Sequence, residues 1–177
     1  SDETQDFRLA TSLQGFTLGD ELWDMFDPAM QLSRDPAEIT FDVTGVGTTG
    51  VDLLDVMALS QMAGPPPVEV DEVTIENLRI AAVGAEVTAE GAMTFDWSDF
   101  QTIPGVPRPE GEITLNVNGA NALMDTLVAM GLLPEDQLMM PRMMMGMFAT
   151  PVGDDMLTST IEINSEGHVL ANGQRLR

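Results

Sequence analysis

Two short stretches of strictly alternating polar and apolar residues constrain the fold of this chain most strongly. Glu38–Gly45 and Glu112–Gly119 place an apolar side chain at every second position, and they match position for position in residue type. A period of two is typical of strands that bury one face. We expect helices in the Leu-rich segments that follow, Val51–Leu59 and Asn121–Met130, and a looser copy of the same plan at Phe7–Phe26. The sequence therefore predicts a repeated strand-then-helix module.

Further alternating segments predict that most of the remaining chain is sheet. Val70–Ala82 and Ala85–Phe95 have the pattern of two long strands, with a bulge near Asn77 where the alternation slips. Leu157–Ile163 begins a hairpin that turns at Asn164–Gly167. The predicted fold class is α+β: a large, curved, mainly antiparallel sheet with short helices packed on one face.

The helices themselves are expected to be short. Asp20 can cap the first one, and Asn121 can cap another that ends where Gly131 adopts a left-handed conformation. Pro141 interrupts a continuous helix through Phe148, so two short helical pieces are expected in that region.

The domain prediction is a single α+β domain over residues 1–177. The clearest punctuation in the chain is Gly64–Pro67, a glycine followed by three prolines, which has the composition of a stiff connector. It leaves open a division into two sub-units, 1–63 and 68–177.

The charge balance restricts the partners that the protein can have. Acidic residues number 29 against 7 basic residues, all of them arginine, and the net charge is −22. A surface this negative repels phosphate backbones, so we expect no nucleic-acid partner. Apolar residues make up 44% of the chain, which is typical of a folded protein and not of a disordered one.

The residue types that usually carry chemistry are scarce. The chain has no cysteine and a single histidine, His168, so thiol chemistry and the usual zinc sites are excluded. We expect His168 to be an exposed strand residue, and Gly45–Gly50 to be a flexible turn instead of a phosphate cradle. Acid pairs such as Asp24/Asp27 and Asp154/Asp155 are expected on solvated faces, with weak calcium binding as the alternative. The sequence predicts a protein that is not an enzyme and has no cofactor, no metal and no catalytic residue.

One cluster has a second interpretation. Six methionines fall within nine residues, and their helical segment is apolar nearly all round except at Arg142. Such a helix is normally buried, and we expect most of the cluster in the core. The alternative is a groove for a hydrophobic ligand or a partner helix, because thioether side chains adapt to irregular shapes. The candidate ligand-binding residues are Met139, Met140, Arg142, Met143, Met144, Met147 and Phe148.

Several motifs resemble an uncharacterised bacterial cell-envelope family, domain of unknown function 2125. The ending Asn172-Gly173-Gln174-Arg175-Leu176 is the most specific of them, and its hairpin is also similar to the end of AsmA-like periplasmic proteins. The other segments that carry the resemblance are Leu22–Pro28, Thr94–Trp97, Gly111–Leu115, Ala122–Pro134, Leu157–Glu162 and Gly167–Ala171. The resemblance implies a periplasmic, inner-membrane-associated, non-enzymatic protein of which this chain is the C-terminal part. No apolar run of the chain is long enough to span a bilayer, so we expect any membrane anchor upstream.

The leading functional hypothesis is therefore a periplasmic envelope module that binds a lipid-like ligand or a partner helix in a groove lined by Met and Leu. A purely structural or interaction domain without a ligand is the second hypothesis. The third is an acidic hydrolase, which needs two carboxylates that face each other across a cleft.

Overall fold

The computed structural model describes residues 3–50, 57, 60–61 and 68–176 of the chain. The expected connector Gly64–Pro67 and, apart from Met57, the expected helix Val51–Leu59 lie outside the described residues. The described elements are β1 (Glu3–Phe16), α1 (Asp20–Phe26), β2 (Ala37–Thr49), β3 (Val68–Ala82), β4 (Ala85–Asp96), β5 (Arg108–Asn118), α3 (Ala120–Ala129), the 3₁₀ helix η1 (Glu135–Leu138), α4 (Met139–Phe148), β6 (Thr150–Gly153), β7 (Met156–Ile163), β8 (Val169–Ala171) and β9 (Gln174–Arg175).

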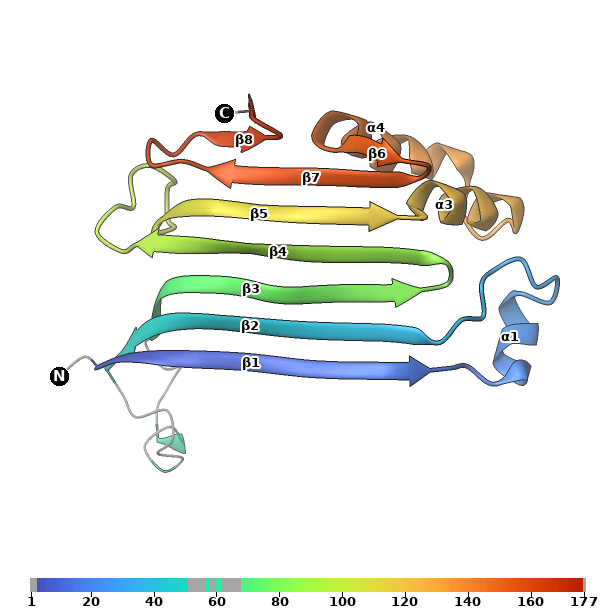
Figure 1. Ribbon diagram of the computed structural model, residues 1–177, viewed down its shortest axis with the longest axis horizontal. Helices are drawn as coiled ribbons and strands as arrows, with labels where there is room; N and C mark the ends of the chain where they lie inside the picture. The colour runs from blue at the N-terminus through green and yellow to red at the C-terminus, as the bar shows by residue number, and fades with distance from the viewer. Residues whose placement is uncertain (1–2, 51–56, 58–59, 62–67, 177) are drawn as a thin grey trace.

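The nine strands form one antiparallel sheet in the order β1-β2-β3-β4-β5-β7-β8-β9, and β6 also pairs with β7 (Figure 1). Neighbours in the chain are neighbours in the sheet from β1 to β5, so the path is a simple meander. Val83 and Gly84 both have positive φ and turn the chain between β3 and β4. The predicted bulge near Asn77 is confirmed by the register shifts of β3 against β2 and β4. The predicted α+β class with a mainly antiparallel sheet is also confirmed.

The pairing register places the apolar side chains of the long strands on one side of the sheet, which we call the apolar face. Opposed residues in an antiparallel pair point to the same side, and successive residues of a strand point to opposite sides. The other side carries mostly threonine and charged residues. The apolar face includes Phe7, Leu9, Leu13, Ile39, Phe41, Val43, Val70, Val73, Ile75, Leu78, Ile80, Val87, Ala89, Ile113, Leu115, Val117, Leu157, Ile161 and Ile163.

The two matching stretches lie in β2 and β5, and their apolar side chains share the apolar face. The two strands run in opposite directions, however, because each strand from β2 to β5 is antiparallel to the one before it. The strand-then-helix plan is seen at β1–α1 and at β5–α3, where both helices lie beyond the same end of the sheet (Figure 1).

The expected turn at Gly45–Gly50 is wrong, because β2 continues to Thr49 and pairs with β1 and β3. Gly45 does not form a turn; its missing side chain lets the Phe7 ring and the Glu72 backbone come close to it. A Cβ at Gly45 would lie 2.4 Å from the Phe7 ring and 2.4 Å from the Glu72 carbonyl oxygen, so a larger residue would push these groups away.

The sheet is thinly covered. The described apolar side chains that are buried are Trp23, Leu32, Val43, Ala89, Leu138 and Ala171. On the apolar face, by contrast, Leu9 is 62% exposed, Leu13 50% and Ile80 44%. Much of this face is therefore open to solvent, above all near the β1 border.

A buried carboxylate organises the segment after α1. Asp27 has no solvent exposure and accepts hydrogen bonds from the backbone N–H groups of Gln31 (2.8 Å) and Leu32 (2.9 Å). The guanidinium of Arg34 lies 5.2 Å from the centre of the Trp23 ring, which is the buried residue of α1. The expected cap at Asp20 is displaced by one residue, since Gly19 precedes the helix and Asp20 is its first residue.

A second carboxylate caps α3 from a distant turn. Asp155 accepts hydrogen bonds from the backbone N–H groups of Asn121 (3.1 Å) and Ala122 (2.9 Å) and from the Asn121 side chain (2.8 Å). The predicted cap at Asn121 is therefore wrong: Asn121 lies inside the helix, which follows Gly119. Gly131 ends the segment with φ of 71°, as predicted.

Among the described residues, no helix combines the length and the apolar character that crossing a membrane requires.

Candidate functional site

The methionine-rich segment forms the helix α4 directly after η1, so two short helical pieces are present as predicted. The expected interruption at Pro141 is wrong, because the division falls between Leu138 and Met139 and α4 continues through Pro141. Pro141 lies in the first turn of α4, where a missing backbone N–H costs no intrahelical hydrogen bond. The helix is held to the sheet at its last residue. The Phe148 carbonyl accepts hydrogen bonds from Ser159 Oγ (2.5 Å) and Asn172 Nδ2 (2.8 Å).

Five of the methionines form a single surface of α4. At about 100° per residue, Met139, Met143, Met147, Met140 and Met144 fall within an arc of about 140°. All five are exposed, by 72%, 54%, 59%, 61% and 50% respectively. We call this surface the methionine stripe.

The expectation that most of the cluster packs in the core is therefore wrong for these five residues. Met145 and Phe148 are half-buried and lie outside the arc of the stripe. An amphipathic helix normally turns its apolar side inward, and α4 turns most of its methionines outward instead.

The structure separates Arg142 from the methionine stripe. Arg142 projects from the other side of α4 and forms an ion pair with Asp125 of α3. Its role in the fold is to link the two helices, so of the seven candidate residues the five methionines form one surface, while Arg142 and Phe148 lie outside it.

Several hollows of the described part of the protein lie along the sheet. Four open hollows are lined by strand and turn residues, and none of the four includes a methionine. One of them, about 400 Å³ in volume, lies on the polar side of the sheet, where Glu76, Glu90 and Glu112 line it. The methionine stripe is thus an exposed helix surface and not the wall of one of these hollows.

The acid pairs considered for calcium binding are partly engaged elsewhere. Asp27 and Asp155 bind backbone N–H groups, as described above. Burial works against the charged form of Asp27, but the N–H groups of Gln31 and Leu32 outweigh it, so the pKa of this carboxyl lies below its usual value. Within the described ranges, no group of three histidine, cysteine or acidic side chains is placed to hold a metal ion.

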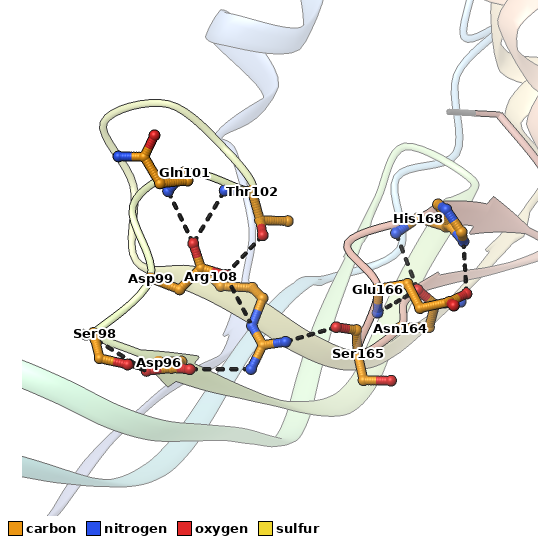
Figure 2. Close-up of polar contacts among 10 residues, drawn as sticks. All are labelled: Asp96, Ser98, Asp99, Gln101, Thr102, Arg108, Asn164, Ser165, Glu166 and His168. Atoms are coloured by element: carbon orange, nitrogen blue, oxygen red, sulfur yellow. Dashed lines mark hydrogen bonds and ion pairs between the residues drawn. The ribbon is translucent and has the colours of Figure 1, made fainter.

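A polar network at the other end of the sheet was not predicted from the sequence (Figure 2). Arg108 at the start of β5 donates hydrogen bonds to the Ser165 carbonyl (2.6 Å) and to the Asp96 carboxylate (3.0 Å). Its Nε lies 3.6 Å from the Asp99 carboxylate. The network ties the loop between β4 and β5 to the turn between β7 and β8.

The remaining contacts of the network are local and structural. Side-chain and backbone donors of Ser98 lower the pKa of Asp96, and those of Thr102 and Gln101 lower the pKa of Asp99. His168 is half-buried in the turn before β8, with Nδ1 3.2 Å from a Glu166 carboxylate oxygen. The expectation of an exposed strand residue is therefore wrong for His168. These side chains are engaged with one another, which indicates a structural role.

No family model matches this chain, and neither the curated proteins nor the solved structures contain a match to it.

Proposed function

We propose that this protein is a non-enzymatic module that binds a hydrophobic, lipid-like ligand or a partner helix, with the methionine stripe of α4 as its contact surface. The observation that carries the proposal is the outward orientation of five methionines on one side of a single helix. Burying a methionine side chain contributes roughly 1.5–3 kcal/mol, so a surface that leaves five exposed gains free energy when it is covered.

The chemistry of the methionine side chain supports a ligand of irregular or variable shape. Its unbranched, polarisable thioether can repack against acyl chains or against the apolar side of another helix. The anchoring of Phe148 to Ser159 adds a second argument, because Ser159 lies opposite Leu115 and so points to the apolar face. The end of α4 thus lies next to the apolar face, where the neighbouring Leu115, Leu157 and Ile161 are half-buried.

The proposed setting is the bacterial periplasm, with an inner-membrane anchor upstream of this chain. The support for it is the resemblance of the closing motif Asn172–Leu176 and the other quoted segments to an envelope family. A net charge of −22 favours uncharged or cationic partners over anionic surfaces.

The proposal is tested by what the protein carries when it is purified without detergent. Native mass spectrometry should detect adducts with the mass of acyl lipids, and a fluorescent analogue of an uncharged acyl lipid should bind with saturation and be displaced by unlabelled monoacylglycerol. A partner helix would instead appear as a bound polypeptide in the same spectra. An adduct-free spectrum together with no saturable probe binding would leave a purely structural domain as the better interpretation.

A further inference from the structure

The two borders of the sheet differ in a way that indicates an interaction surface. At one border, β7 is flanked by the short strands β6, β8 and β9, of 4, 3 and 2 residues. At the other border lies β1, a strand of 14 residues (Figure 1). It pairs with β2 along its length, and in the described part of the chain no strand pairs with its outer side. Every second residue of β1 therefore presents its backbone N–H and C=O groups outward.

The features that normally protect a long border strand are lacking over the middle of β1. Natural sheets block such borders with short strands, proline, lysine or a bulge. The segment from Phe7 to Leu13 has no proline, lysine or bulge, and the irregularity in its pairing begins only after Leu13. Its one charged residue, Arg8, donates two hydrogen bonds to Asp42 of β2, at 2.9 and 2.6 Å.

We propose that the outer side of β1 pairs with β1 of a second copy of this chain, antiparallel and about a twofold axis at Ala10. In this register Phe7 lies opposite Leu13 of the second copy, and Leu9 lies opposite Thr11. These residues are on the apolar face, where Leu9 and Leu13 are at least half exposed and Phe7 is 39% exposed. The pairing covers apolar surface with apolar surface, which stabilises antiparallel strands.

In the same register, the β1 residues on the polar side of the sheet also pair without conflict between the two copies. Arg8 lies opposite Ser12, Asp6 lies opposite Gln14, and the small side chain of Ala10 meets its own copy at the axis. No like charges face each other directly. A register centred on Leu9 would instead place Leu13 opposite Gln5, so the register at Ala10 pairs the apolar residues better.

The dimer would extend the sheet and its apolar face across two protomers. Because each protomer carries a net charge of −22, repulsion between them opposes association at low salt. Salt should therefore strengthen the dimer, in contrast to an interface held by ion pairs.

The test uses the whole chain and two variants of Ala10, which is exposed on the polar side of the sheet. Ala10→Glu and Ala10→Lys each place like charges opposite each other at the proposed axis. Sedimentation velocity over micromolar to millimolar concentrations should show a dimer for the wild type, strengthened by added salt, and monomers for each variant alone. An equimolar mixture of the two variants should form a heterodimer, because glutamate then lies opposite lysine. Circular dichroism checks that both variants keep the sheet.

Three results would overturn the proposal: a monomeric wild type over the whole concentration range, variants that dimerise like the wild type, or a variant mixture that stays monomeric. If the wild type is monomeric, the remaining interpretation is that β1 pairs with a strand of another segment or of another protein. None of these readouts depends on the methionine stripe, so this test and the test of ligand binding can fail separately.

Discussion

Ser159 of β7 donates a 2.5 Å hydrogen bond to the carbonyl of Phe148, the last residue of α4. This contact fixes the end of the methionine-rich helix on the apolar side of the sheet. Without it, the Phe148 carbonyl keeps only the longer hydrogen bond from Asn172 (2.8 Å).

Ser159→Ala should therefore lower the free energy of unfolding by about 1 kcal/mol, the typical net contribution of one hydrogen bond. Urea unfolding followed by circular dichroism measures the change. Ser12→Ala, at an exposed serine of β1, serves as the control and should be close to neutral. Equal effects of the two substitutions would argue against the anchoring role of Ser159.

The buried carboxylate of Asp27 predicts a pH dependence of stability. Its pKa in the folded protein lies below the usual value of about 3.9, since the backbone N–H groups of Gln31 and Leu32 more than offset the effect of burial. A lowered folded-state pKa means that the stabilisation is complete above the usual value and is lost as the pH falls through the folded value.

Asp27→Asn should consequently melt well below the wild type at neutral pH, because an amide cannot accept both N–H groups in the same way. The gap between the two melting temperatures should narrow as the pH falls below about 4. Other carboxylates titrate in both proteins, so the difference isolates Asp27. A gap that stays constant down to pH 3 would show that the Asp27 charge does not stabilise the fold.

The capping of α3 by Asp155 predicts a local stability effect. Asp155→Asn keeps a residue type that tolerates the observed φ of 50°, but it weakens the hydrogen bonds to Asn121 and Ala122. We expect a loss of about 1 kcal/mol in the free energy of unfolding, typical of a helix cap. The neighbouring Asp154→Asn is the matched control and should change stability little. Chemical denaturation of both variants measures the two changes in the free energy of unfolding. Equal changes would argue against a capping role of Asp155.

The sheet was predictable because alternation is a local signal. Val70–Ala82 and Ala85–Phe95 were placed almost to the residue, since each carries one apolar face and a turn residue separates them. The extent of β2 was not predictable in the same way. Gly45 and Gly47 have the composition of a turn, and the glycine at position 45 is explained only by the close approach of the Phe7 ring and the Glu72 carbonyl oxygen, which no local pattern indicates.

The helix caps and the orientation of α4 could not be predicted, because both depend on contacts between residues far apart in the chain. Asp155 is 34 positions from Asn121 in the chain, so no local pattern indicates that it caps α3. For α4, composition indicates an apolar helix, but which side turns outward depends on how Phe148 and the neighbouring helix α3 hold it. The sequence therefore identified the methionines as a candidate site and placed most of them wrongly in the core.

Whether the methionine stripe binds a ligand is decided by thermal unfolding and probe binding of the double variant Met143→Gln/Met144→Gln. The two residues are 54% and 50% exposed, so the change should shift the melting temperature little while it abolishes saturable binding of the fluorescent analogue of an uncharged acyl lipid. The half-buried Met145→Gln is the control and should lower the melting temperature more, because its amide loses contact with water. A double variant that melts many degrees lower and binds the probe like the wild type would show that Met143 and Met144 belong to the core and not to a ligand-binding surface.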